Sequence, residues 1–175
     1  MITYRNILAG DYDQIEAFEI EAFEEAREEI DAFIVEELED MFSYTENNFA
    51  TYFGLVACIG DEIIGYLIGF KLNQFPTKRA VIRCFVSPEY RRQGVGSQLI
   101  QRVEPTESGH RVSAEVSDED YASAAFLRKN GYTVIEVVEA EYNEEGEKEM
   151  DGFMILVNEK KARMSLTQRL TWRAN

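Results

Sequence analysis

The residues best suited to hold a ligand form one short loop, residues 91–97, which reads RRQGVGS. The loop follows an apolar run typical of a strand and precedes a helical pattern, so its backbone N–H groups should gather at the positive end of a helix dipole. That arrangement binds phosphate, and Gly94 and Gly96 allow a turn or a close backbone approach that a β-carbon would prevent. The spacing matches neither the nucleotide-hydrolysing P-loop nor the dinucleotide-binding GxGxxG pattern. An ordinary strand-to-helix turn with surface arginines is the alternative interpretation.

Other catalytic and metal sites find little support in the sequence. His110 is the only histidine and lies in a Gly-His-Arg turn with no nucleophile motif nearby, which argues against a hydrolase triad. One histidine and two separated cysteines, Cys58 and Cys84, leave no convincing transition-metal site, so we expect no metal cofactor. Both cysteines lie in apolar runs, which is typical of buried thiols in a reducing cytosol.

Hydrophobic periodicity predicts the elements that position this loop. Apolar residues recur every three to five positions between residues 11 and 53, which predicts one or two amphipathic helices. Two further helices are predicted, one after the glycine loop and one over residues 117–132 with Gly131 as its left-handed cap. Apolar, β-rich runs predict strands at residues 2–8, 52–59, 63–72, 78–86, 111–116, 132–142 and 152–158. The pattern therefore predicts a single α/β domain of about seven strands and about four helices over residues 1–159.

The net charge of −15 is concentrated in one block. Residues 11–46 hold fifteen acidic residues against Arg27 alone, a net of −14, whereas the other 139 residues hold eighteen acids against seventeen bases. Such a chain is a poor partner for nucleic acid. A concentrated negative field would instead attract a cationic partner. The alternative is that these acids are the solvated faces of surface helices.

The last sixteen residues, 160–175, form a basic tail with five basic residues and no acidic ones. Docking of this tail within the chain or against a second subunit, giving a homodimer, is one hypothesis, and a disordered tail is the other. The amino-terminal residues show neither a secretory signal nor a membrane anchor, and no apolar run approaches the ~20 residues that span a bilayer. We therefore expect a cytoplasmic protein without a membrane partner.

The segment VSPEYRRQGVGSQLI resembles the acetyl-CoA-binding motif of the Gcn5-related N-acetyltransferases (GNAT), with Arg91, Gly94 and Gly96 at its three defining positions. About twenty residues later, SAEVSDEDYASAAFLRKNGY is similar to the next strand and helix of that family. The order and spacing of both motifs agree over most of the chain, and the second is most similar to the ribosomal-protein alanine N-acetyltransferases. The resemblance implies a mixed, mostly antiparallel GNAT-like sheet.

The same resemblance implies a site for acetyl-CoA as cosubstrate. Its pyrophosphate would lie on the loop amides and its pantetheine beside the strand that ends at residues 85 and 86, while the arginines could also pair with phosphate. The implied cofactor-binding residues are Phe85, Val86, Arg91, Arg92, Gln93, Gly94, Val95, Gly96 and Ser97.

The resemblance also assigns catalytic candidates. Glu115 falls where the family places a catalytic glutamate, so it is the expected general base, although a solvent-facing strand glutamate would look the same. Where the family has a proton-donating tyrosine this chain has Leu127, and Asp120 replaces the usual Asn. Tyr142 or a water could supply the missing proton, and an exposed tyrosine at a strand end is the alternative explanation for Tyr142.

The leading functional hypothesis is an N-acetyltransferase for a cationic primary amine: a basic peptide or protein N-terminus, a lysine side chain or a polyamine. Residues 120 and 127 keep a second hypothesis open, in which the protein binds acetyl-CoA as a sensor or structural ligand and transfers nothing.

Overall fold

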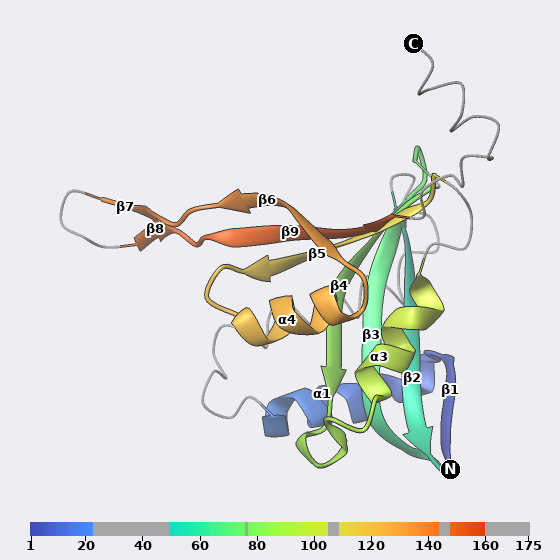
Figure 1. Ribbon diagram of the computed structural model, residues 1–175. Helices are drawn as coiled ribbons and strands as arrows, with labels where there is room; N and C mark the ends of the chain where they lie inside the picture. Colours follow the sequence, from blue (N-terminus) through green and yellow to red (C-terminus); the bar gives the residue numbers. More distant parts are fainter. Residues whose placement is uncertain (23–49, 76, 105–108, 144–147, 160–175) are drawn as a thin grey trace.

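The fold is described from a computed structural model, which covers residues 1–22, 50–75, 77–104, 109–143 and 148–159 (Figure 1). Most of the acidic block and the whole basic tail, residues 160–175, lie outside these described residues, so the expectations about them stay predictions. No helix among the described residues is long and apolar enough to cross a membrane.

Nine strands, three α-helices and two short 3-10 helices make up the described chain. In chain order they are β1 (Ile2–Asn6), η1 (Ala9–Asp11), α1 (Tyr12–Ala22), β2 (Ala50–Ile59), β3 (Glu62–Leu72), β4 (Lys78–Val86), η2 (Pro88–Tyr90), α3 (Val95–Val103), β5 (Arg111–Ser117), α4 (Tyr121–Lys129), β6 (Thr133–Val138), β7 (Glu141–Tyr142), β8 (Lys148–Met150) and β9 (Phe153–Glu159).

Seven of the strands form one mixed sheet in the order β1-β2-β3-β4-β5-β9-β6. All neighbours are antiparallel except β4 and β5, which are parallel because the chain returns to the same end of the sheet through α3. The expected fold class, a mostly antiparallel α/β sheet of about seven strands, is confirmed.

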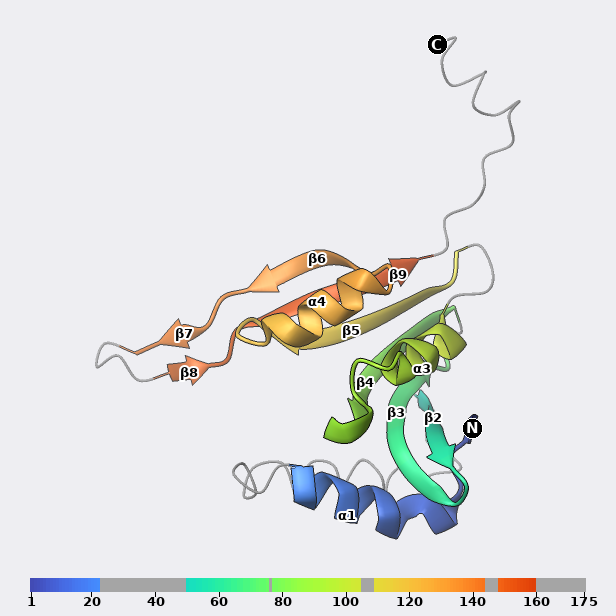
Figure 2. The same ribbon diagram turned by 60° about the horizontal axis from the view of Figure 1, so that its bottom comes forward.

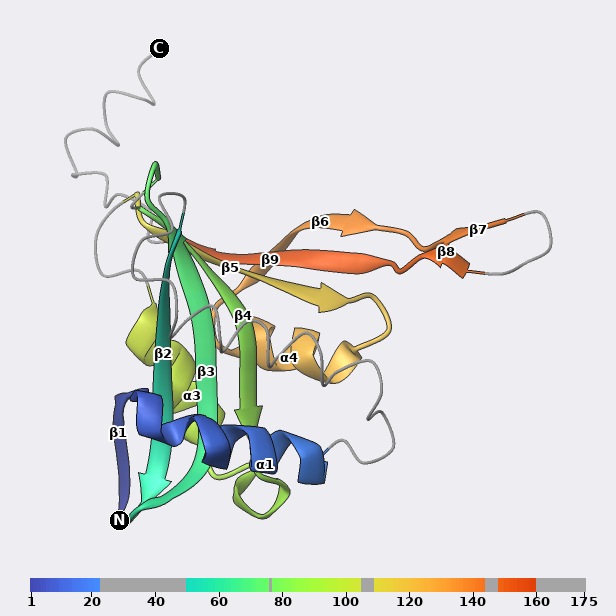
Figure 3. The ribbon, with the colours of Figure 1, turned by 180° about the vertical axis from the view of Figure 1, so that it is seen from behind.

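Helices cover the two faces of the sheet unequally. Helices α3 and α4 lie on the face in front in Figure 1, and α1 lies on the opposite face, across β2, β3 and β4 (Figure 3). The larger core cluster includes Leu67, Leu99, Val112 and Leu156 and fills the space under α3 and α4. A smaller cluster packs Ile15 of α1 against the other face. Of the described helices, none covers β5, β9 and β6 on the α1 side of the sheet (Figure 3).

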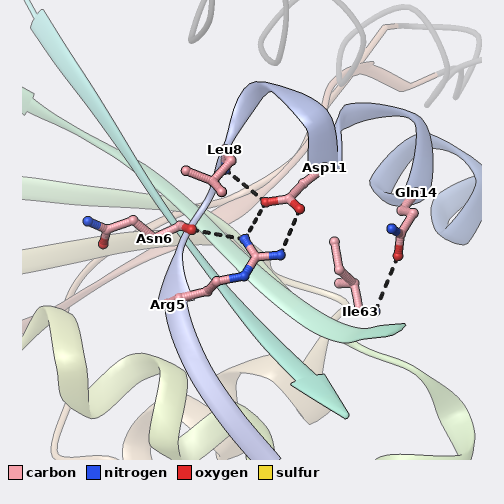
Figure 4. Close-up of polar contacts among 6 residues, drawn as sticks. All are labelled: Arg5, Asn6, Leu8, Asp11, Gln14 and Ile63. Carbon is pink, nitrogen blue, oxygen red and sulfur yellow. Dashed lines mark hydrogen bonds and ion pairs between the residues drawn. The ribbon is translucent and has the colours of Figure 1, made fainter. Parts of the chain in front are cut away.

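An ion pair ties the start of α1 to β1. The Arg5 guanidinium donates to both carboxylate oxygens of Asp11 at 2.6 and 2.8 Å, and the Leu8 N–H donates to the same carboxylate at 2.8 Å (Figure 4). Asp11 is only 5 % exposed, and these hydrogen bonds hold the pKa of its carboxyl below the usual range. This first acid of the acidic block therefore has a structural partner.

The structure divides the last predicted strands. Residues 132–142 form β6 and β7 rather than one strand, and β7 pairs with β8 in a separate two-stranded sheet. The resulting arm extends past α4, away from the rest of the fold (Figure 2). Apolar, β-branched residues over 133–138 predicted the strand, and the break falls at Glu139 and Ala140, where that run ends.

Candidate functional site

The two parallel strands of the sheet pair over only part of their length. Register partners run from Lys78↔Arg111 to Val81↔Ala114, which is four pairs, although β4 continues to Val86 and β5 to Ser117. Beyond these pairs the strands diverge, as Figure 1 shows. The peptide groups on the open side of β4 have no neighbouring strand there. We call the space between the diverging ends the splay.

The loop that follows β4 has an unusual backbone. Gly94 is the N-cap of α3 and has a φ of 86°, in the left-handed region that glycine adopts without steric cost. Arg92 has a φ of 63° and is the sole non-glycine residue with positive φ among the described residues. A left-handed L-residue costs roughly 1–2 kcal/mol, so the rest of the loop must hold Arg92 in place.

Six consecutive backbone N–H groups, those of residues 92–97, donate to no other described residue. The first bond of the helix runs from the Gln98 N–H to the Gly94 carbonyl at 2.9 Å, and no side chain caps α3. Orphan N–H groups at a helix start carry the positive end of the dipole and suit an anion. Gly94, Val95, Gly96 and Ser97 form this helix start, and their assignment to phosphate stays a prediction.

Arg91 turns back onto the end of β4. Its Nε donates to the Val86 carbonyl at 2.9 Å, and its guanidinium carbon lies 5.2 Å from the centroid of the Phe85 ring. Gln93 stabilises the same turn by donating from Nε2 to the Glu89 carbonyl at 2.9 Å. Arg91 and Gln93 therefore shape the loop, and Arg92 is the exposed arginine without such a contact to a described residue.

At Val86, the last residue of β4, one backbone group remains open toward the splay. The Ser87 N–H donates to the Ile64 carbonyl on β3, and peptide groups alternate along a strand, so the N–H and carbonyl of Val86 point away from β3. The Val86 carbonyl accepts a hydrogen bond from Arg91, so the Val86 N–H is the group that remains for a ligand. The Phe85 side chain packs in the smaller core cluster instead of lining the splay.

Helix α4 packs against the loop helix at a close distance. A β-carbon on Gly96 would lie 3.2 Å from the Phe126 ring, so glycine there lets α3 and α4 approach. Asp120 caps α4 by accepting from the Ser123 N–H at 2.9 Å. The acid at this position therefore keeps a capping function that an Asn could also perform. Leu127 is 5 % exposed and belongs to the larger core cluster.

Glu115 lies on β5, one residue after Ala114, which is the last β5 residue paired with β4. This position is at the mouth of the splay. Val112 and Ala114 are buried under α3 and α4, and side chains alternate along a strand, so Glu115 lies on the opposite face with Arg111 and Ser113. It is exposed and faces the same side of the sheet as α1. The splay therefore has the phosphate-type loop at one end and a carboxylate on β5.

Tyr142 does not lie with these residues. It is on β7, 57 % exposed, and the three ribbon views place β7 on the outlying arm, away from the end of β4 (Figures 1–3). The structure thus brings together the loop, the end of β4 and Glu115, and leaves Tyr142 apart.

A cationic pocket on β5, four residues along the strand from Glu115, was not predicted from the sequence. Lys78, Arg79 and Arg111 line a pocket of about 280 Å³ at the paired ends of β4 and β5. The alternation of side chains along a strand could have predicted that Arg111 and Glu115 share one face. The pairing of β4 with β5, which brings Lys78 next to Arg111, has no signal in the local sequence. Among the described residues no group of three or more His, Cys, Asp or Glu could hold a metal ion.

The family and the fold of this chain follow from comparison with known proteins. A model of the acetyltransferase (GNAT) family matches residues 13–132. A protein assigned to the same family from Desulfovibrio desulfuricans superimposes with a TM-score of 0.74 at 18 % identity, covering 91 % of this chain and 99 % of its own. The ribosomal-protein-S18-alanine N-acetyltransferase from Escherichia coli gives 0.64 at 15 % identity, covering 95 % and 98 %.

The PaiA N-acetyltransferase from Thermoplasma acidophilum, in complex with coenzyme A, gives a TM-score of 0.61 at 16 % identity, covering 91 % of this chain and 99 % of its own. At such identities these structures show a shared fold alone. No curated protein sequence matches this chain.

Proposed function

The chain belongs to the acetyltransferase (GNAT) family and is an N-acetyltransferase that uses acetyl-CoA, and from this premise we propose which residues bind, which react and which amine is modified. The N–H groups of residues 92–97, next to the splay, donate to no other residue that the structure describes, and this observation carries the proposal. They suit the pyrophosphate of acetyl-CoA, because aligned N–H groups at a helix start stabilise a diphosphate without needing a counter-charge. The Arg92 guanidinium adds a charged donor at the same place.

The pantetheine arm would extend along the open edge of β4. The Val86 N–H points into the splay and is the donor we assign to an amide carbonyl of that arm. Arg91 and Gln93 act through the loop, since both donate to backbone carbonyls at the end of β4 or in η2. Bound acetyl-CoA supplies a thioester whose acetyl group the acceptor amine takes.

Glu115 is the general base in this proposal. A lysine-like amine has a pKa near ~10.4 and a chain amino terminus near ~7.7, so the acceptor arrives at least partly protonated. The Glu115 carboxylate takes that proton, directly or through one water, and the freed lone pair attacks the thioester carbon. As the carbon–sulfur bond breaks, the nitrogen releases a second proton to water, which balances the proton that the departing thiolate takes up. General-base assistance of this kind contributes roughly 10²- to 10⁴-fold in rate.

The leaving thiolate needs no strong acid. A thiol titrates near ~8.5, so coenzyme A can leave as a thiolate and take its proton from water. Leu127 cannot donate one, and burial raises the pKa of the Tyr132 hydroxyl far above its usual value, which makes it a poor donor too. For Tyr142 to act as the acid, the β7–β8 arm must move toward the splay, and Tyr142→Phe tests this: a loss of kcat would support it, and unchanged kcat would assign the proton to water.

The proposed acceptor is a cationic primary amine. The acidic block carries a net charge of −14, and its described part lies on the same side of the sheet as Glu115. Such a field raises the encounter rate of cations and is screened by salt. Raising the salt concentration should increase the KM of the acceptor more than that of acetyl-CoA, and equal increases would remove the steering argument.

The test is release of coenzyme A thiol from acetyl-CoA with N-terminal peptides, lysine peptides, polyamines and aminoglycosides, for wild type and Glu115→Gln. Glu62→Gln, at the exposed turn between β2 and β3, is the matched control. Turnover that is lost in Glu115→Gln and kept in Glu62→Gln would support the base. Binding of acetyl-CoA by calorimetry without turnover for any amine would favour the sensor hypothesis, which the buried Leu127 keeps open.

A further inference from the structure

The pocket beside Glu115 has an apolar floor on the sheet face opposite α3 and α4. Ile155 and Val157 of β9, Ile135 of β6 and Phe70 of β3 line it. Ile135 is 60 % exposed, although large aliphatic side chains are usually buried. This floor lies where none of the described helices covers the sheet (Figure 3). An exposed apolar surface with polar edges is typical of a binding site.

One end of this pocket is cationic. Lys78 and Arg111 are direct register partners on β4 and β5, so their β-carbons lie one strand spacing apart, ~4.8 Å. Like charges directly opposite each other destabilise a sheet unless an anion lies between them. The Lys78 ammonium rests 4.4 Å from the centroid of the Phe75 ring, and among the described residues neither cation forms an ion pair. The pocket lining itself contains no acid.

The acid nearest to this end is Glu159, which stands opposite Arg111 on β9. It is exposed and lies outside the pocket lining, so it balances at most one of the two cations, Lys78 and Arg111, whose side chains share this face.

The other end of the pocket is acidic. Ile155 pairs with Glu115 on one side and with Glu136 on the other, so two exposed carboxylates flank this residue of the floor. Glu115 lies four residues along β5 from Arg111, which is about 13 Å in an extended strand. The surface is therefore a groove with Glu115 at the splay, Glu136 across β9 from it, an apolar middle and cations at the far end. We call it the dipolar groove.

A dipolar groove of this length selects among amines. An ammonium group beside Glu115 would lie next to the proposed acetyl donor, with Glu136 adding negative charge from two strand spacings away. About 13 Å away, Lys78 and Arg111 would repel the second ammonium of a polyamine and attract a carboxylate. In an extended peptide the fourth Cα lies about 10 Å from the first, and its side chain reaches a few ångströms further.

We propose that the dipolar groove binds the acceptor, and that the acceptor is a peptide amino terminus with apolar second and third residues and an acidic fourth residue. This inference rests on the function proposed above and narrows its three amine classes to one. The acidic block attracts the amino end of the peptide. The cationic end of the groove then orients the peptide by binding its acidic fourth residue.

The experiment compares two amidated peptides, Ala-Leu-Val-Glu-Gly-Gly and Ala-Leu-Val-Lys-Gly-Gly, by thiol release and by calorimetry in the presence of coenzyme A. Wild type should prefer the glutamate peptide in kcat/KM by about tenfold, the effect of one charge-assisted hydrogen bond. Arg111→Glu and Lys78→Glu should each abolish or reverse the preference.

Arg128→Glu, the same charge change on α4 across the sheet, is the matched control and should keep the preference. Equal kcat/KM for the two peptides in wild type, or a preference that survives Arg111→Glu, would overturn the groove proposal while the transferase function stands. If no amine is acetylated, the proposed function fails, and calorimetry decides the groove: tighter binding of the glutamate peptide that Arg111→Glu removes supports it, and equal affinities overturn it.

Discussion

Replacement of Gly94 by alanine tests whether the loop conformation aims the N–H groups at acetyl-CoA. Gly94 has a φ of 86°, and a β-carbon there would meet no atom within 4 Å, so the cost of alanine is conformational and not steric. Holding an alanine in this region costs about 1–2 kcal/mol. A loop that instead relaxes toward negative φ rotates the peptide groups that begin α3.

The expected loss of affinity follows from the number of N–H groups displaced. A hydrogen bond to a charged group contributes about 1.5–3 kcal/mol, so losing one weakens acetyl-CoA binding roughly tenfold to a hundredfold. Calorimetric titration with acetyl-CoA measures this, and urea denaturation measures the free energy of unfolding.

Gly109→Ala is the matched control. Gly109 also has positive φ, 83°, and open space around its β-carbon position, but it lies just before β5 and outside the loop. Both variants should lose at most about 1–2 kcal/mol in the free energy of unfolding. Only Gly94→Ala should bind acetyl-CoA more weakly. Equal affinities for the two variants would refute the assignment of the loop as the pyrophosphate site.

Three further predictions concern residues with structural roles. Asp120→Ala should lower the free energy of unfolding by about 1 kcal/mol in urea denaturation, because the cap on Ser123 is lost, whereas Asp120→Asn should stay within about 0.5 kcal/mol; equal losses would contradict the capping role. Asp11→Asn should destabilise the fold by about 1.5–3 kcal/mol at pH 7. The pKa of Asp11 is lowered in the fold, so its contribution is present above the unfolded pKa near ~3.9 and is lost as pH falls through the folded value, and the wild-type advantage should shrink below about pH 4; a pH-independent difference would contradict this. Desolvation raises the pKa of Cys84 to about 12 and that of the buried Cys58 above its usual value, so mass spectrometry should find neither thiol alkylated at pH 8 until urea is added; labelling of the native protein would contradict the raised thiol pKa values.

Much of the fold could be predicted from local pattern. The strand that became β4, the hairpin turn at Gly60 and the cap at Gly131 all depend on residues close together in the chain, and both glycines have the positive φ that such turns require. The main difference between the predicted and the observed strands lies in the arm, where the predicted strand over residues 132–142 is divided into β6 and β7. Glu139 and Ala140 stand at the break, and both residue types are depleted in strands, so local propensity indicated a break that the predicted single strand ignored.

The amino-acid sequence by itself determined the loop, because a glycine-rich turn between a strand and a helix is specified by neighbouring residues. It also determined the family, through two motifs at a fixed separation. Only the tertiary structure decided where β4 and β5 part, which side chains meet across them and that Tyr142 lies on a separate arm. Lys78 and Arg111 are far apart in the chain and become neighbours through one parallel strand pair. Contacts of that kind depend on register, which the whole sheet sets and no local stretch encodes.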